Sequence, residues 1–271
     1  MPRLAHSIEA SLVLVEDPKN VRAPEGCPEP WFWVRGDDLV GLADGDPFTS
    51  WTDRGTGGND LYPDPYKLDP VFASDVVDGI GGLRAPSSAD PFIDQAGLKN
   101  RLFEKPFPDG MTLFVVLTEK GGDDIWEGFW GGQTGVGDNA FLSFYVSDEG
   151  ILSTTGEEYL EFIQFGAERS GGWYAYDTGF TFPAAVMWRL GPDLLTLSVN
   201  GVEQQPDGAW DPAFDTPSWD PVPVWRNLQL FSNRSTEQTA EVLIFDTVLT
   251  PECEAQWWAY LAGRYPSLGV V

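Results

Sequence analysis

The sequence predicts an all-β fold: a sandwich of two antiparallel sheets with one short C-terminal helix and an extended N-terminal arm. Glycine and proline number 30 and 22 in a chain of 271 residues, which is typical of many short strands joined by turns. Residues 111–118 form a continuous apolar run, as expected of a central strand buried on both faces. Thr250 followed by Pro251 is a helix start signal, because threonine caps helices and proline favours the first helical position.

Residues 1–30 are predicted to form an arm or linker, and residues 31–271 a single β-sandwich domain. The prolines that favour an extended linker are Pro18, Pro24, Pro28 and Pro30. Residues 11–16 predict a strand without a partner nearby in the sequence. Such a strand pairs either within its own domain or with a sheet edge of another subunit, and both alternatives stay open. No signal-peptide pattern is visible in the first residues.

The domain itself predicts short strands and turns in regular alternation. Further strands are expected over residues 31–35, 50–51, 140–146, 160–165, 173–176, 227–232 and 242–245. Residues 184–202 predict a β-hairpin, with turns at Gly191 and at Asn200-Gly201. Residues 61–76 are expected to be extended or irregular, and the acidic-aromatic segments 121–139 and 206–225 to be loops. The predicted helix ends near the stop signals Gly263 and Pro266. Its residues that should lie against the sheet are Trp257, Tyr260, Leu261 and Tyr265.

Composition excludes several function classes. The net charge of -26 disfavours a nucleic-acid partner, because phosphate binding needs clustered Lys and Arg. It indicates a solvated, self-repelling surface, with salt adaptation and basic partners as alternatives. No apolar run is long enough for membrane insertion.

His6 is the single histidine, which disfavours Ser-His-Asp or Cys-His catalysis and a His/Cys metal site. Cys27 and Cys253 form either one bridge or two free thiols, and we expect free thiols.

Three segments resemble the concanavalin A-like lectin/glucanase superfamily, in its laminin-G-like branch. They are residues 31–60 with a Trp-x-Asp and Gly-Asn-Asp loop, the hairpin 184–202, and the closing strand and helix at 240–265. The resemblance frames residues 31–266 and implies a jelly-roll β-sandwich. This superfamily includes lectins, hydrolases, adhesion modules and virion proteins, so the fold alone does not assign an activity.

Hydrolysis is disfavoured on the residues themselves. Retaining glycosidases need two carboxylates about 5 Å apart, which glucanases of this fold supply from a Glu-x-Asp-x-Glu strand. No glutamate of this chain is followed two residues later by aspartate, and the acidic cluster at 123–127 falls in a predicted loop. We therefore expect no enzymatic activity, and keep glycoside hydrolase as a minor alternative.

Calcium is the cofactor that the composition permits, because it binds carboxylate and carbonyl oxygens. The resemblance implies a site near the rim of the sandwich. The candidate ligands are Asp53, Asn59 and Asp60 in the Gly-rich loop. The alternative is that Asp53 and Asn59 only cap turns through hydrogen bonds to the backbone.

Glycan binding would use flat aromatic faces and planar polar groups on a concave surface or a loop rim. The candidates are Trp126, Trp130, Gln133, Trp173 and Tyr176. The alternative for each aromatic residue is a place in the core or in a subunit contact, because 12 tryptophans exceed what one glycan site needs.

The resemblance implies a non-enzymatic structural protein of a phage virion, either a capsid decoration or a tail-associated protein. Its expected partners are other virion proteins or copies of itself, held through the N-terminal arm, and a glycan on a cell surface. Its expected location is the virion, assembled in the host cytoplasm. The alternative is a carbohydrate-binding, lectin-like module of a bacterial surface protein, located at the cell surface.

Overall fold

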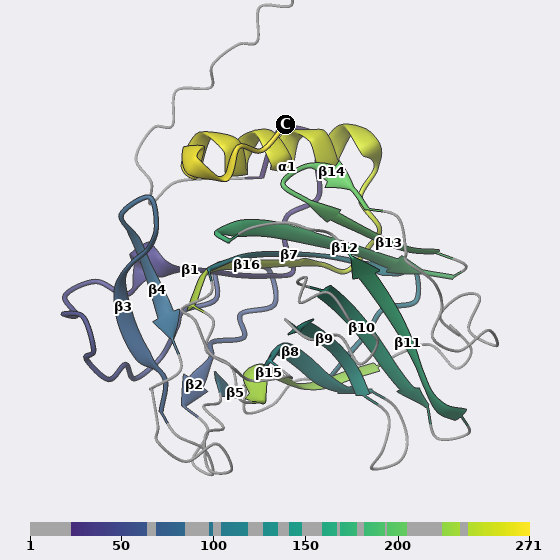
Figure 1. The fold of residues 1–271 in the computed structure, drawn as a ribbon, viewed down its shortest axis with the longest axis horizontal. Helices are drawn as coiled ribbons and strands as arrows, with labels where there is room; N and C mark the ends of the chain where they lie inside the picture. Colours follow the sequence, from purple (N-terminus) through teal and green to yellow (C-terminus); the bar gives the residue numbers. More distant parts are fainter. Residues whose placement is uncertain are drawn as a thin grey trace, which may run out of the picture.

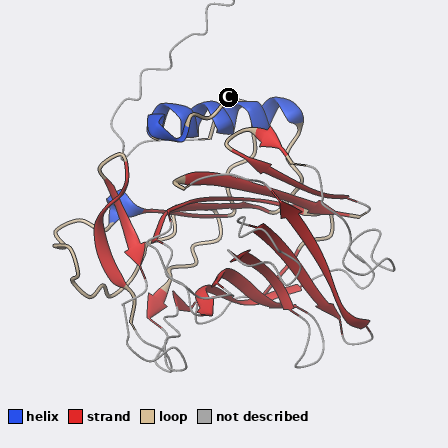
Figure 2. Ribbon diagram, viewed as in Figure 1, coloured by secondary structure: helices blue, strands red, loops and turns tan. Residues whose placement is uncertain are grey.

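The protein folds into two antiparallel β-sheets and one helix (Figures 1 and 2). The computed structural model describes residues 23–63, 69–84, 98–99, 104–118, 127–134, 141–147, 159–166, 169–177, 182–192, 194–204, 224–233 and 238–271. Helix α1 (Pro251–Arg264) lies on one side of the first sheet and the second sheet lies on the other side (Figure 1). We call these the helix-side sheet and the outer sheet. The predicted all-β sandwich with one C-terminal helix is confirmed.

The helix-side sheet contains the strongest strands. In spatial order it comprises β14 (Val202–Glu203), β13 (Leu194–Val199), β12 (Ala184–Gly191), β7 (Met111–Thr118), β16 (Gln238–Phe245), β4 (Ile80–Arg84) and β3 (Val71–Val77), and β1 (Phe32–Arg35) also pairs with β16. The predicted hairpin over 184–202 is present as β12 and β13, whose register pairs Val186 with Val199.

The outer sheet brings together residues from the middle of the chain. In spatial order it comprises β11 (Arg169–Asp177), β10 (Tyr159–Gly166), β9 (Phe141–Ser147), β8 (Glu127–Thr134), β15 (Val224–Asn233), β5 (Leu98–Lys99) and β2 (Tyr62–Pro63), and β6 (Glu104–Pro106) also pairs with β15. All pairings in both sheets are antiparallel. Two 3₁₀ turns, η2 (Gly36–Asp38) and η3 (Pro266–Leu268), complete the described elements.

The strands β3, β4 and β8 were not predicted, nor were the short strands β2, β5, β6 and β14. The expectation of irregular backbone over 61–76 is wrong in part, since β3 begins at Val71 and pairs with β4 across a tight turn at Asp78-Gly79. Both turn residues have positive φ, 54° and 75°. The loop prediction for 121–139 is wrong where β8 runs. Its glycines indicate a loop locally, but pairing with β9 and β15 on both sides holds this segment as a strand.

Strand β7 is buried on both faces, as its continuous apolar run predicts. Alternate residues enter two different cores. The inter-sheet core, between the two sheets, includes Phe32, Val34, Leu113, Val115, Leu117, Val186, Trp188, Val242 and Ile244. The helix core, between the helix-side sheet and α1, includes Trp33, Phe114, Val116, Met187, Leu243, Phe245, Trp257, Trp258, Leu261 and Tyr265.

Helix α1 has the expected start and the expected buried face. The Thr250 hydroxyl accepts a hydrogen bond from the Cys253 N–H at 3.4 Å, and Pro251 occupies the first helical position. The helix ends at Arg264, two residues before Pro266. Trp257, Leu261 and Tyr265 are buried against the sheet, and Tyr260 packs partly buried beside them. In the described residues, no helix combines the length and the apolarity that crossing a bilayer requires.

Cys27 and Cys253 form a disulfide, so the prediction of free thiols is wrong. Their Cα atoms lie 5.4 Å apart, although 226 positions separate them in the sequence. The bridge joins the N-terminal segment to the first turn of α1, where Ala23 and Cys27 pack against the helix core. Residues 23–30, which were predicted as part of the arm, are therefore attached to the domain by a covalent bond.

Candidate functional site

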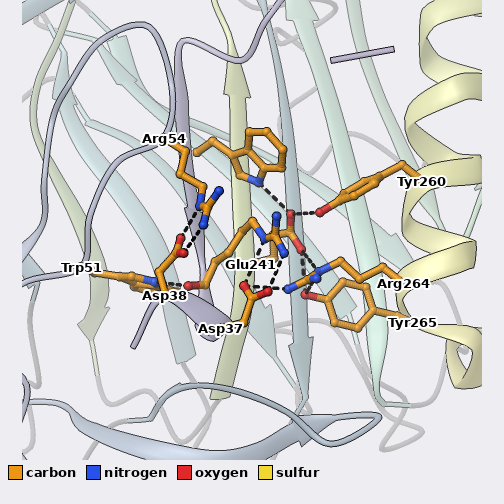
Figure 3. Close-up of polar contacts among 10 residues, drawn as sticks. Asp37, Asp38, Trp51, Arg54, Glu241, Tyr260, Arg264 and Tyr265 are labelled. Carbon is orange, nitrogen blue, oxygen red and sulfur yellow. Dashed lines mark hydrogen bonds and ion pairs between the residues drawn. The ribbon is translucent and has the colours of Figure 1, made fainter. Parts of the chain in front are cut away.

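The most extensive polar cluster in the described chain surrounds Glu241, a fully buried residue of β16 (Figure 3). Its Oε1 accepts hydrogen bonds from Trp33 Nε1 at 2.7 Å and from the Tyr260 hydroxyl at 2.8 Å. Its Oε2 accepts from Arg264 Nε at 2.8 Å and from the Tyr265 hydroxyl at 2.7 Å. Three of these donors come from α1 and the residue that follows it, so the carboxylate fastens the end of the helix to the sheet.

Further ion pairs extend this cluster toward η2. Arg264 lies 2.9 Å from Asp37, and Asp37 also binds the buried Arg35, with Nε–Oδ1 and Nη2–Oδ2 distances of 3.1 and 2.5 Å. Arg54 pairs with Asp38 beside them (Figure 3). Three arginines thus meet three acids, and the formal charges of the cluster cancel. A buried charge is tolerated when it is paired in this way.

The charges also keep the two tyrosines protonated. Burial, followed by the charge of Glu241, raises the pKa of Tyr260 and of Tyr265 well above the ordinary value. Burial lowers the pKa of Arg264, but the combined effect of Glu241, Tyr265, Tyr260 and Asp37 outweighs burial and raises it. Glu241 is fully buried, and its hydrogen bonds to Tyr260, Arg264 and Tyr265 hold the end of α1 against the helix-side sheet.

Asp53, the first predicted calcium ligand, organises the Gly-rich loop. Its Oδ1 accepts the N–H groups of Trp33 at 2.8 Å and Gly55 at 2.7 Å, and its Oδ2 accepts the N–H of Asn59 at 2.6 Å. Asp60 in turn binds the backbone of Asp53, because its Oδ1 accepts the Asp53 N–H at 2.9 Å. Burial raises the pKa of Asp53, against the lowering effect of these N–H donors.

This geometry supports the turn-cap alternative for Asp53, and Asp60 caps a turn as well. Asn59, the other residue of that alternative, takes part through its backbone N–H. In the described residues, His, Cys, Asp and Glu side chains form no group of three or more that could hold a metal ion. The loop also approaches β1 closely, because a Cβ at Gly55 would lie 2.5 Å from the Trp31 carbonyl oxygen. Asp53 and Gly55 therefore shape one turn against β1. A calcium ion bound by Asp53, Asn59 and Asp60 stays a prediction.

Replacing Asp53 by asparagine should lower the free energy of unfolding by about 1–3 kcal/mol, because the amide NH₂ would meet a buried N–H donor. The matched control is Asp75→Asn, whose carboxylate accepts the Gly79 N–H at an exposed turn. Urea denaturation measures both. Melting the wild type with and without EDTA separates the alternatives: a downward shift with EDTA that Asp53→Asn abolishes would contradict the turn-cap role and support calcium.

Four of the five glycan candidates lie on the outer sheet: Trp130 and Gln133 on β8, and Trp173 and Tyr176 on β11. Trp126 lies outside the described residues. Residues directly opposite one another in antiparallel strands share a face, and faces alternate along each strand. The register places Trp130 opposite Phe144, Phe144 opposite Phe162, and Phe162 opposite Tyr174. Tyr176 comes two positions after Tyr174 and shares its face. Trp130 and Tyr176 therefore lie on one face of the sheet.

Gln133 and Trp173 lie on the opposite face. The register places Trp173 opposite Ile163, Ile163 opposite Ser143, and Ser143 opposite Gly131. Gln133 comes two positions after Gly131. The register thus divides the described candidates between the two faces, and their role in glycan binding stays a prediction.

Residue chemistry predicts which face is directed toward the core. Most positions on the face of Trp130 are apolar, namely Trp130, Leu142, Phe144, Val146, Leu160, Phe162, Tyr174, Tyr176 and Leu230, and the polar ones are Glu127 and Gln164. An apolar face of this kind covers the inter-sheet core. The other face, which we call the far face, is more mixed and contains Gln133, Phe141, Ser143, Tyr145, Tyr159, Glu161, Ile163, Trp173 and Ala175. In the described part of the chain, no helix or strand is stacked on it (Figure 1).

Comparison with known proteins gives a likeness in structure alone. Neither a family model nor a curated protein matches the sequence. A structure of botulinum neurotoxin type C, whose cell entry is described as dependent upon interaction with two ganglioside molecules, matches with a TM-score of 0.53 and 8% identity over 86% of this chain and 51% of that one. The fold is a concanavalin A-like β-sandwich.

Two further structures match this concanavalin A-like sandwich less closely. The binding domain of botulinum neurotoxin serotype D gives a TM-score of 0.49 at 11% identity, over 86% of this chain and 51% of that chain. Domain 4 of AbnA, an extracellular arabinanase from Geobacillus stearothermophilus in complex with arabinotriose, gives 0.48 at 14% identity, over 84% of this chain and 98% of that chain. The chain spans about half of the neurotoxin chains that it matches. The laminin-G-like branch and the phage origin stay predictions.

Sequence reasoning missed two features of this concanavalin A-like sandwich. The first is the buried polar cluster around Glu241. The sequence feature that could have indicated it is an acidic residue within the otherwise apolar strand 240–245. The second is the disulfide, which has no local sequence signal because its cysteines lie near opposite ends of the chain.

Proposed function

We propose that the protein is a non-enzymatic glycan-binding module whose far face holds the sugar. The observation that carries this proposal is the register of β8 to β11, which gathers Gln133, Ser143, Tyr145, Glu161 and Trp173 on one face. Sugars present hydroxyl groups and apolar C–H faces, and both are complemented here by amide, hydroxyl and carboxylate groups beside two aromatic residues. The apolar positions of the opposite face supply the core instead.

The comparison supports a glycan as ligand. The neurotoxin structure with this fold is described as interacting with gangliosides, which are glycolipids. Fold likeness at this identity carries no residue roles, so the register of this chain's own strands supports the site.

The Cys27–Cys253 bridge supports a location outside the reducing cytosol. Structural disulfides persist in oxidising environments, and glutathione and thioredoxin keep cytosolic thiols reduced. We therefore propose that the module works on a cell surface or on an extracellular particle. A phage virion falls within the second class, and its capsid or tail position stays a prediction.

A glycan array tests the proposed function. We expect the wild type to bind at least one glycan, Trp173→Ala to weaken that binding by at least tenfold, and the exposed control Val202→Ala on β14 to leave it unchanged. Melting temperatures of all three proteins should agree within a few degrees. Binding to no glycan would refute the proposed function, and unchanged binding by Trp173→Ala would refute the far face as its site.

A further inference from the structure

We propose that the far face selects neutral sugars over sialylated or sulfated ones, with Glu161 as the specificity-determining residue. This inference rests on the proposed glycan-binding function and names the ligand class of that same site. It is carried by the positions of acidic, basic and aromatic residues in the register of the outer sheet.

Glu161 occupies the centre of the aromatic part of the far face. The register places it directly opposite Tyr145 on β9, and Trp173 on β11 is its diagonal neighbour. In antiparallel sheets such positions have Cβ atoms about 5 Å apart when opposite and roughly 7–8 Å apart when diagonal. Tyr145 and Trp173 lie two strands and two residues apart, or roughly 12 Å, so an oligosaccharide that spans both positions passes over the position of Glu161. Asp177, two positions after Ala175 on β11, adds a second acid to this end of the face.

Two basic residues of the far face lie on the other side of the sheet, and a third, Arg169, is the first residue of β11. Arg226 on β15 is opposite Gln133, and Glu104 on β6 is opposite Arg226. Lys99 on β5 is opposite Gln229, one strand further away. With neighbouring strands about 4.8 Å apart, β15 lies three strands from Glu161, or roughly 14 Å, and β5 roughly 19 Å.

These distances decide which charge a bound sugar meets. The Debye length at physiological ionic strength is about 8 Å, so Arg226 and Lys99 are screened from the aromatic positions. Arg169, at the first position of β11, lies four residues from Trp173, or roughly 13 Å along the strand. Asp177 lies four residues from Trp173 on the other side, so it is screened to the same extent as Arg169. A carboxylate or sulfate on the sugar would therefore meet Glu161 as the nearest charge. The net charge of -26 opposes anionic ligands over longer distances in the same sense.

A neutral sugar gains from the same carboxylate. An ionised carboxylate accepts hydrogen bonds at both oxygens, and neighbouring hydroxyl groups of a pyranose or furanose ring can donate two together. Charge-assisted hydrogen bonds of this kind are stronger than neutral ones. The negative charge of Glu161 would thus strengthen hydrogen bonds from the hydroxyl groups of a neutral sugar and repel an anionic sugar.

The test uses a panel of matched glycans, each neutral oligosaccharide beside its sialylated and its sulfated form, titrated against the full chain. We expect the wild type to bind the neutral form at least tenfold more tightly at 50 mM NaCl, with the ratio shrinking as salt rises. Glu161→Gln should reduce that ratio to about threefold or less. The control Glu203→Gln, on β14 of the helix-side sheet, should keep the wild-type ratio.

The outcomes separate this inference from the proposed function. Equal or tighter binding of anionic forms by the wild type would refute the inference and leave the glycan-binding function standing. An unchanged ratio in Glu161→Gln would refute the role of this residue. Binding to no member of the panel would refute the function and, with it, the inference.

Discussion

Replacing Cys27 and Cys253 together by serine is expected to lower the free energy of unfolding by about 4–5 kcal/mol, the value for a disulfide that closes a loop of 100 residues or more. The bridge spans 226 positions, so its loss returns nearly the whole chain to free conformational sampling in the unfolded state. It also removes the covalent link between the N-terminal segment and α1. Urea denaturation under non-reducing conditions measures the loss.

The wild type under reducing conditions is the matched control for this double variant. Dithiothreitol should move the wild-type midpoint to that of the variant and should leave the variant itself unchanged. Each single cysteine variant should lose as much as the double variant, because either change removes the bond. A double variant with the wild-type midpoint would show that the bridge does not restrain the unfolded chain.

Replacing Glu241 by glutamine is expected to cost about 3–5 kcal/mol, the usual loss when one partner of a buried ion pair is removed. The substitution removes the charge that balances Arg264, which is held to Glu241 at 2.8 Å. It also brings an amide NH₂ against N–H or O–H donors, where the carboxylate accepted four hydrogen bonds. Equilibrium denaturation measures the loss, and hydrogen exchange over residues 251–264 should show α1 opening first.

Glu203→Gln is the control for this second variant. Glu203 also pairs with an arginine, Arg189 at 3.0 Å, but its side chain is 51% exposed. Exposed ion pairs contribute about 0–1 kcal/mol, so this change should be nearly neutral. Equal losses in both variants would contradict the argument that burial makes Glu241 decisive. Unaltered exchange over α1 in Glu241→Gln would contradict its role in holding the helix.

The fold followed from patterns that are local in the sequence. The apolar run of β7 indicates burial on both faces because no polar residue alternates within it, and the structure confirms this. Thr250 and Pro251 determine where α1 begins through local hydrogen bonding and fixed backbone angles. By contrast, β8 contains glycines at positions 128, 131 and 132, and only its pairing with distant strands makes it a strand. Local propensity cannot report such pairing.

The sites depended on contacts that the sequence does not display. Asp53 was identified, with the turn cap as an alternative, because aspartate among glycines is typical of both calcium loops and turns. The division of Trp130 and Trp173 between two faces follows from strand register, which shifts at a bulge between Gly128 and Trp130. A shift of one residue exchanges the faces, so the composition of a segment cannot assign its aromatic residues to a ligand or to the core.

The disulfide also helps to place both ends of the described chain on the same side of the molecule. Ala23, Cys27 and Val270 all pack on the helix core, so both ends of the described chain lie on the α1 side of the helix-side sheet. Figure 1 shows the outer sheet on the opposite side. A bead or sensor chip coupled through Val271 would therefore hold the molecule with the far face of the outer sheet turned toward the solution. Many copies fixed in this way would form a layer with the far face outward.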